Sequence, residues 1–411
     1  IGFTRIAGSP EEEKAAQILK EECDKIGVPA IIEPFEIEQG IVEEAKLEIL
    51  EPFRQEYPVT GYQCAENTPE EGLVADFVYV ENGDDVSLRD VRGKIVLVNG
   101  FMRVPLFRKL MKAGVAGIVT MEGELRDKRE ETDLSTRKLR RTLRTFGNVP
   151  MVHTRVADAM DLVRKGACKA RLVLKGRTEE WTSHNVIATV LGTEKPEEIV
   201  SFGAHYDSVD FSKGVYDNGA GSVINMEVLR YFAENPPKRT LKFVWYGSEE
   251  IGLEGSWAYV KAHKEELEAH KLMINVDVGG PVLGVDRITA TAEKALASYL
   301  EYFVKIHGFT AEVKQGIYSS DSIPFADSGI PGVNFTRFGA PGAAYIHDRF
   351  DTLSFLSADM LEKTTRIVLE FGKEMANAAL VPVERKIPQN IVEDVEKYLY
   401  KKELSEAAEE K

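Results

Sequence analysis

The chain has 411 residues, of which 43% are hydrophobic and 29% are charged. This composition supports substantial buried cores and is most simply divided between two domains. The formal net charge of −15 argues against nucleic acid and anionic membrane surfaces as partners, because both would repel the protein.

The cysteine content and the lack of a long apolar run indicate in which cellular compartment the protein is expected. No apolar run is long enough to span a bilayer, so no membrane partner is expected. The three cysteines, Cys23, Cys64 and Cys168, are scattered and odd in number, which is typical of small buried residues rather than of a disulfide framework. We therefore expect a cytoplasmic protein; secretion is the alternative, since a processed start would leave no trace in the sequence.

The first predicted element is a helix that begins after Ser9. Ser9 suits the N-cap, Pro10 suits the first helical position, and Glu12 stands where a capping box requires an acidic side chain. The apolar spacing predicts that the helix continues to Ile26 and ends at Gly27.

A separate module is expected in the next part of the chain, where short strands alternate with loops rich in glycine and proline. Within it, strands are expected at 94–98, 117–119 and 170–174, and helices at 106–113 and 157–165. The segment 126–144 mixes arginine and lysine with acidic residues, which is typical of a solvated, mobile loop. An anion or partner site in that segment is the less favoured alternative.

From residue 185 onward, apolar strands alternate with amphipathic helices. This alternation predicts a covered, largely parallel sheet, in which ligands bind beyond the carboxyl ends of the strands. The expected strands are 185–191, 199–204, 241–246 and 272–276, and the expected helices are 219–233, 256–270, 293–306 and 358–379.

Residues that can bind metal ions gather at the expected strand ends. Two histidines and three carboxylates could hold a pair of divalent cations that share one bridging carboxylate and a position for water. One of the two adjacent glutamates would then be free to take a proton from the water and pass it to a leaving amine. The candidates are His205, Asp207, Asp217, Glu249, Glu250, Asp277 and, in a later loop, His347.

Each candidate also has an ordinary structural interpretation. Alone, the pair Glu249 and Glu250 would be explained by the dipole of the following helix, and Asp217 by a turn and helix cap. The joint occurrence of five possible ligands in one alternating domain favours a metal site. The histidines on predicted helices, interpreted as surface or partly buried side chains, are His263, His270 and His307.

The order of the motifs supports a family resemblance that covers most of the chain. The motifs are His205-x-Asp207, Asp217-Asn218-Gly219, Glu249-Glu250-x-Gly252-Leu253-x-Gly255-Ser256, Asn275-x-Asp277, Ser320-Asp321 and His347-x-x-x-Asp351. In this order they resemble the M28 family of zinc peptidases. The resemblance implies that His205 and Asp277 hold one zinc ion, that Glu250 and His347 hold the second, and that Asp217 bridges them. Cobalt or manganese could replace zinc.

The resemblance also implies a fold and an activity. The fold is α/β, with a mixed, mainly parallel sheet covered by helices on both faces, as in zinc-dependent exopeptidases. The expected substrates are peptides, which lose their amino-terminal residue; Glu249 is the general base and then the general acid, and Asp207 orients His205. The oligomeric state is not indicated.

The resemblance divides the chain into three parts. Residues 3–9 are similar to the family's opening helix, which implies a discontinuous catalytic domain of residues 1–40 and 178–385. The insert, residues 41–177, looks like a smaller, β-rich protease-associated (PA) domain, and we expect it to act as a lid or specificity module. Residues 386–411 form a charged, helical tail.

Some positions depart from the family pattern. Many relatives have a tyrosine directly before the last histidine, where it steadies the oxyanion, but here Ile346 occupies that position and Tyr345 precedes it. Ser322 stands where many relatives have a histidine. Tyr318, Ser319 and Asp321 are expected near the substrate.

Functions other than aminopeptidase activity would each require particular sequence features. A carboxypeptidase or dipeptidase on the same metal site would need a cation for the substrate carboxylate, and Arg337 is the candidate. Glutaminyl cyclisation is disfavoured because the full two-metal ligand set is present. A non-catalytic binding module would be expected to have lost ligands, and none of the five is missing.

Overall fold

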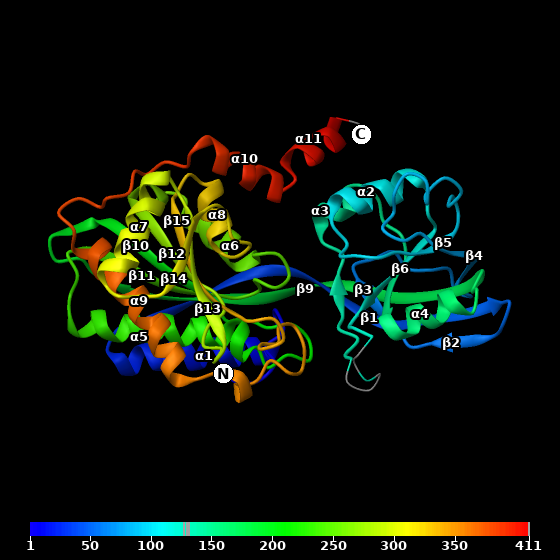
Figure 1. Cartoon of the computed structure of the whole chain (residues 1–411), viewed down its shortest axis with the longest axis horizontal. Coiled ribbons are helices and arrows are strands. Elements are labelled where there is room, and N and C mark those ends of the chain that lie inside the picture. The colour runs from blue at the N-terminus through cyan, green and yellow to red at the C-terminus, as the bar shows by residue number, and fades with distance from the viewer. Residues whose placement is uncertain (126–127, 129–131, 410–411) are drawn as a thin grey trace. The chain divides into compact units, whose positions relative to one another are not determined.

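The chain forms two compact units in a computed structural model that describes residues 1–125, 128 and 132–409 (Figure 1). Unit 1 comprises Ile1–Ile37 and Thr182–Leu399, and unit 2 comprises Glu38–Trp181 and Tyr400–Lys411. Unit 1 is therefore built from two stretches of chain that most of unit 2 separates in sequence.

The sheet of unit 1 is mixed and mainly parallel, which confirms the predicted fold class. β10 pairs in parallel with β11 and β12, and β12 pairs in parallel with β15. β9 runs antiparallel to β11, and β13 antiparallel to β15. The strand order is β14-β13-β15-β12-β10-β11-β9. The strands are β9 (Lys169–Val190), β10 (Lys195–His205), β11 (Arg239–Tyr246), β12 (His270–Val276), β13 (Gly284–Thr291), β14 (Ala311–Gln315) and β15 (Gly332–Gly339).

Helices cover both faces of this sheet because successive side chains of its strands point in opposite directions. Phe243 and Trp245 of β11 pack into the largest hydrophobic cluster, whereas the alternate residues Val244 and Tyr246 pack on the other side. The first face is covered by α1 (Pro10–Ile26), α5 (Ala220–Glu234), α7 (Lys294–Ile306) and α9 (Ala358–Asn377), and the second by α6 (Glu254–Ala262), α8 (Ser322–Asp327) and α10 (Gln389–Tyr398).

The first helix has the boundaries that its sequence predicts. The Ser9 hydroxyl accepts a hydrogen bond of 3.2 Å from the backbone N–H of Glu12. At the other end Gly27 adopts a left-handed conformation, with φ of 91°, in which glycine meets no Cβ penalty. The two caps explain why α1 begins and ends where it does.

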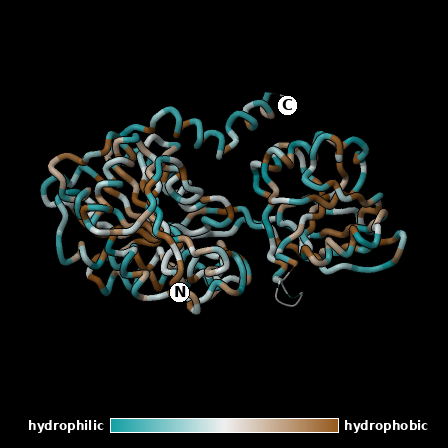
Figure 2. The backbone as a smooth tube through the Cα atoms, in the orientation of Figure 1, coloured by the Kyte–Doolittle hydropathy of each residue, from teal (hydrophilic) through white to brown (hydrophobic). Residues whose placement is uncertain are grey.

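Unit 2 is a β-rich α/β module with two hydrophobic clusters of its own. Figure 2 shows hydrophobic residues gathered along the central strands of each unit. The strands of unit 2 are β1 (Ala30–Glu51), β2 (Gln55–Tyr57), β3 (Thr60–Gln63), β4 (Leu73–Tyr79), β5 (Ile95–Leu97), β6 (Gly117–Glu122), β7 (Arg137–Lys138) and β8 (Met151–Arg155), with the first part of β9; its helices are α2 (Val104–Ala113), α3 (Arg141–Arg144), α4 (Val156–Arg164) and α11 (Lys401–Glu409).

The segment 126–144 was predicted to be a mobile loop. Residues 126–127 and 129–131 lie outside the described residues. The prediction is wrong for the end of the segment, which holds β7 and α3, because Leu139 and Leu143 are buried there. Basic side chains of the segment form ion pairs, Arg137 with Glu122, and Arg141 and Arg144 with Glu38.

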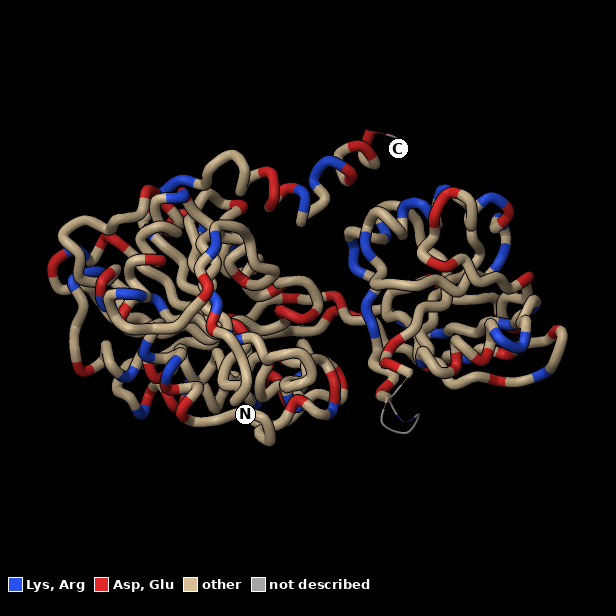
Figure 3. Tube along the Cα trace, viewed as in Figure 1, with Lys and Arg blue, Asp and Glu red and all other residues tan. Residues whose placement is uncertain are grey.

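Other differences from the predictions concern helix and tail boundaries. The helix predicted at 256–270 ends at Ala262, and His270 instead opens β12. The charged tail divides at Leu399: α10 belongs to unit 1 and α11 to unit 2. Figure 3 shows mainly acidic residues on α10 and both acidic and basic residues on α11. Cys23 is buried as expected, but Cys168 is exposed. Among the described residues, every helix is too short or too polar to cross a membrane.

Candidate metal centre

The candidate ligands lie at one edge of the sheet of unit 1. His205 is the last residue of β10, Asp277 directly follows β12, and Glu250 lies in the loop after β11. Because β10 is parallel to both of its neighbours, the carboxyl ends of the three strands meet at the same edge. Strand order thus gathers side chains that are far apart in sequence.

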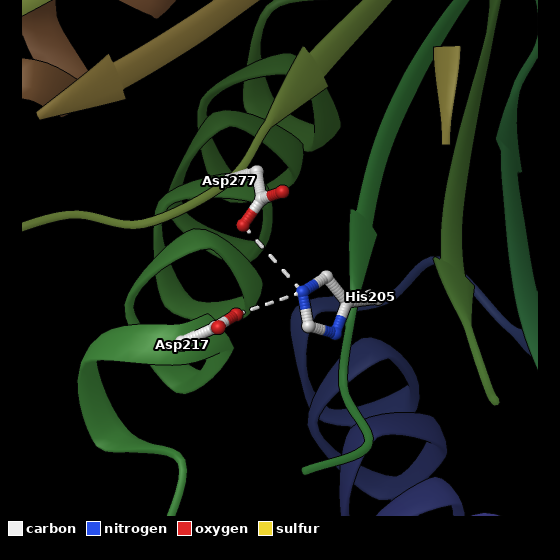
Figure 4. A group of neighbouring side chains, drawn as sticks. All are labelled: His205, Asp217 and Asp277. Carbon is white, nitrogen blue, oxygen red and sulfur yellow. Dashed lines mark ion pairs between the residues drawn. The ribbon is translucent and has the colours of Figure 1, made fainter. Parts of the chain in front are cut away.

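The first group consists of His205, Asp217 and Asp277 (Figure 4). The Nε2 atom of His205 lies 3.0 Å from Asp217 Oδ1 and 3.5 Å from Asp277 Oδ1. All three side chains are at most 7% exposed. Their burial keeps water from competing strongly with a cation for these atoms.

The second group consists of Asp217, Glu250 and His347. The Nε2 atom of His347 lies 3.0 Å from Asp217 Oδ2 and 3.1 Å from Glu250 Oε2. Asp217 therefore belongs to both groups and turns one oxygen to each. The side chain of His347 is half exposed, so this side of the centre faces solvent.

The five residues fit a pair of divalent cations. Imidazole nitrogens and carboxylate oxygens are ligands that Zn²⁺ takes in proteins. The Oδ1 atom of Asp277 is buried and has no hydrogen-bond partner among the described residues. An unneutralised buried carboxylate is unfavourable, and a bound cation would relieve that cost.

The surroundings shift the protonation of the site. Burial alone disfavours a charged imidazole, but nearby carboxylates, Glu249 foremost, raise the pKa of His205 well above its usual value. Burial likewise raises the pKa of Glu249 well above the usual range of a glutamate. The Glu249 side chain forms no hydrogen bond or ion pair within the part of the chain that the structure describes.

Left-handed backbone conformations occur beside the candidate ligands. Ser248, Val278 and His347 have φ near 60°, a region that residues other than glycine rarely adopt. Each such residue costs on the order of 1–3 kcal/mol and persists only where its surroundings hold it. The hydrogen bonds to these segments are therefore part of the site.

Asp207 lies where the sequence led us to expect it and also holds a second segment. Its Oδ1 atom is 3.3 Å from Nδ1 of His205. The same oxygen accepts a hydrogen bond of 3.0 Å from the backbone N–H of Glu249, and Oδ2 accepts one of 3.1 Å from that of Glu250. One carboxylate thus contacts both His205 and the loop of the two glutamates.

The carboxylate of Asp351 contacts backbone groups of a distant segment. Its carboxylate accepts hydrogen bonds from the backbone N–H groups of Val215, Tyr216 and Asp217, at 3.0, 2.7 and 3.1 Å. It therefore fixes the segment that presents Asp217. Spacing along a loop does not reveal such backbone partners.

Asn218 connects two of the segments that carry candidate ligands. Its Nδ2 donates to the carbonyl of Val276 at 2.9 Å, and its Oδ1 accepts from the N–H of Val278 at 3.1 Å. These two bonds flank Asp277. The Asn218 side chain therefore links the segment of Asp217 to the segment of Asp277.

The opening segment of the chain contributes two residues whose role the sequence did not reveal. The buried guanidinium of Arg5 donates to the carbonyls of Tyr206 and Gly214, on the loops next to His205 and Asp217. Glu12 accepts from the N–H of Ser248 at 3.0 Å. No sequence signal points to these contacts, because their partners are mainly backbone groups.

Arg337 and Tyr345 have partners within the protein. Arg337 is 4% exposed and donates to Asp286 and to the carbonyls of Pro281 and Val282. The ring of Tyr345 packs against Phe350 and Phe355, with centroids 5.4 and 5.9 Å away.

The remaining predicted substrate residues differ in exposure. Asp321 is buried, and burial raises its pKa to about 7. Tyr318 is half buried, and burial followed by the charges of Asp277 and Asp217 raises its pKa well above the usual value. Ser319 is exposed and its hydroxyl lies 2.6 Å from that of Tyr398.

Comparison with known proteins gives a family for this part of the chain. Residues 185–372 match the model described as Peptidase family M28. Human carboxypeptidase Q is 27% identical over 290 residues, which cover 67% of this chain but only 61% of that protein. Aminopeptidase YwaD of Bacillus subtilis is 28% identical over 387 residues, which cover 89% of this chain and 79% of that protein.

Solved structures share the fold over nearly the whole chain. The peptidase M28 precursor from Shewanella amazonensis superposes with a TM-score of 0.75 and 25% identity, over 94% of this chain and 92% of that one. The zinc aminopeptidase BSAP of Bacillus subtilis gives the same TM-score with 23% identity, over 94% and 95%. The mixed, mainly parallel sheet with its covering helices is thus a known architecture.

Proposed function

We propose that this chain, whose residues 185–372 match the model of peptidase family M28, is a metal-dependent exopeptidase that removes amino-terminal residues from peptides. The observation that carries the proposal is the convergence of five ligand-type side chains in two groups that share Asp217. The name of aminopeptidase YwaD, which matches 89% of this chain, supports cleavage at the amino terminus of the peptide.

The two groups suggest which residues hold metal. His205 and Asp277 would hold one zinc ion, Glu250 and His347 the other, and Asp217 both. Bound zinc would polarise the scissile carbonyl and make a water molecule acidic near neutral pH. The zinc aminopeptidase among the similar structures favours this metal. Cobalt and manganese are the substitutes to test.

Glu249 is our candidate for the proton carrier. Its carboxylate has no partner among the described residues, so it is available to accept the proton of the attacking water. It would then hold that proton and deliver it to the leaving amine. Asp207 would keep the His205 ring in one orientation, since it lies beside the nitrogen that faces away from Asp217.

Carboxypeptidase activity is the second candidate, because one of the similar proteins is named carboxypeptidase Q. Recognition of a carboxyl terminus generally requires a cationic side chain that can reach it. Arg337, the expected candidate, is buried and already donates to Asp286 and two backbone carbonyls. This favours aminopeptidase over carboxypeptidase activity. We further propose that unit 2 is an accessory, PA-like module rather than a second catalytic unit.

Three forms of one short peptide test the proposal: the free peptide, its amino-terminally acetylated form and its carboxyl-terminally amidated form. The protein is stripped of metal and then restored with zinc, cobalt or manganese. We expect release of the first residue from the free and amidated peptides and none from the acetylated one. Cleavage of the acetylated but not the amidated peptide would indicate a carboxypeptidase, and absence of both zinc binding and hydrolysis would favour a binding module.

A further inference from the structure

Three successive backbone N–H groups anchor the loop of the two glutamates to buried carboxylates. The N–H groups of Glu249 and Glu250 donate to Asp207, as described above. The N–H of Ser248, directly before them, donates at 3.0 Å to Oε1 of Glu12. Asp207 comes from the end of the neighbouring strand, whereas Glu12 comes from α1, which is 236 positions away from Ser248 in sequence.

The two oxygens of Glu12 have separate partners. Oε2 accepts a hydrogen bond of 2.7 Å from the N–H of Gly8, at the start of α1. Oε1 accepts from the N–H and hydroxyl of Ser248 and from the hydroxyl of Ser183, at 3.0 to 3.2 Å. The side chain is fully buried, so water does not replace these bonds readily. Glu12 therefore connects the helix start directly to the loop.

The contact between Glu12 and the loop is close as well as polar. A Cβ atom at Gly247 would lie 2.8 Å from Glu12 Oε1 and 2.6 Å from the Ser183 hydroxyl, which is too close for any side chain. Ser248 adopts the left-handed conformation, with φ of 59°, that its neighbours must hold in place. Loss of the Oε1 contact would free the Gly247–Ser248 peptide group, one residue before Glu249.

We propose that Glu12 is a positioning residue for the peptidase reaction: through the N–H of Ser248 it fixes the backbone before Glu249 and so the direction in which the Glu249 carboxylate points. This inference rests on the proposed function. A misplacement of a reacting group by about 1 Å can cost on the order of a hundredfold in rate, so a single anchor can matter.

The test compares Glu12→Ala and Glu12→Gln with Ser9→Ala in the full-length, metal-loaded protein. Ser9→Ala is the matched control, because it also removes a cap bond at the start of α1 but does not contact Ser248. For Glu12→Ala we expect kcat to fall about tenfold or more, with KM within about twofold of the wild-type value. Glu12→Gln can turn its amide oxygen to Ser248 and should recover most of the lost kcat. Metal content should not change.

Amide hydrogen exchange gives a second readout that does not need activity. Glu12→Ala should speed exchange at residues 248–250, whereas Ser9→Ala should not. Unchanged exchange there, or an equal loss of kcat in Ser9→Ala, would overturn the proposal. If the wild type released no amino-terminal residue from any peptide, the proposed function would fail, and the exchange data would still decide whether Glu12 anchors the loop.

Discussion

Glu249 and Glu250 are neighbours in sequence with different surroundings. Glu250 lies in a group with Asp217 and His347, whereas the Glu249 carboxylate has no partner among the described residues. Both backbone N–H groups are held by the same carboxylate, Asp207. Two equal side chains on one loop can therefore serve as a metal ligand and as a proton carrier.

Glu249→Gln separates these two roles. The amide keeps the shape of the side chain but cannot accept a proton, so kcat should fall by about 10²- to 10⁴-fold, while bound metal stays at the wild-type level. Steady-state kinetics and elemental analysis measure both. Glu254→Gln, at the first residue of α6, is the control and should leave kcat unchanged. A near-normal rate for Glu249→Gln would remove Glu249 as the base.

At the residue scale, sequence reasoning was informative where chemistry depends on side-chain type. The ligand-type residues at strand ends could be singled out because ligands of such sheets bind beyond the carboxyl ends of the strands. Arg5, Glu12 and Asp351 could not, since their partners are mostly backbone N–H and carbonyl groups. Arg337 was misjudged for the related reason that nothing in the sequence shows Asp286 beside it.

Elements with strong local signals were predicted well, and those defined by distant pairing were not. Ser9 and Gly27 mark the ends of α1 in the sequence as in the structure. The 22-residue strand β1 was not predicted, and β9, also of 22 residues, was predicted only as two short strands, because each takes its pairing partners from well-separated parts of the chain. Strands β13, β14 and β15, whose pairing depends on residues distant in sequence, were not predicted at all.

His270, which was predicted to end a helix but begins β12, leads to a prediction about how stability depends on pH. His270 is buried where β12 begins, with Ser201 at 2.7 Å from Nδ1 and Glu266 at 3.3 Å from Nε2; Lys242 and His263 are the other charged groups facing it. Burial lowers the pKa of His270, so the unfolded chain takes up a proton at a higher pH than the folded chain. Stability should therefore fall as the pH drops below about 6.5.

Urea unfolding of the wild type and of His270→Gln between pH 8 and pH 5 measures this effect. The difference in unfolding free energy should be constant above neutral pH and should shift in favour of the variant on acidification. Contributions from histidines that do not contact residue 270 cancel in the difference. His307→Gln, at a partly exposed site that pairs with Glu374, is the control. A pH-independent difference for His270→Gln would contradict the assignment.

At the scale of the whole molecule, each unit has its own hydrophobic core, and the candidate metal centre lies entirely in unit 1. Unfolding followed by calorimetry should accordingly show two transitions. Ligands that bind only the folded state stabilise it by mass action, by about 2.7 kcal/mol at a hundredfold excess over the dissociation constant. Removal of metal should therefore lower the transition of unit 1 by roughly 5–10 °C and leave that of unit 2 in place.

His347→Ala provides the control for metal removal. It deletes a candidate ligand with a half-exposed side chain, so the variant should lose most of the response of unit 1 to metal. A shift of both transitions by the same amount would show that the effect is not local to the metal centre.

The boundaries of the two units differ by a few residues from those expected from the sequence. Unit 1 ends its first stretch after residue 37 rather than 40 and resumes after residue 181 rather than 177. Both boundaries fall inside the long strands β1 and β9, which themselves continue without a break. Sequence patterns follow elements, so a boundary inside a strand leaves no mark on them.

The discontinuity of unit 1 also sets an order of events during synthesis. Arg5 and Glu12 leave the ribosome first, but Tyr206 and Ser248 follow 201 and 236 positions later. At about 5–20 residues per second, Glu12 waits on the order of 10–50 s for its partner. During that time residues 38–181 of unit 2 are completed, whereas the apolar face of α1 still lacks the strands on which it packs. The nascent chain therefore carries an exposed amphipathic helix through most of its translation.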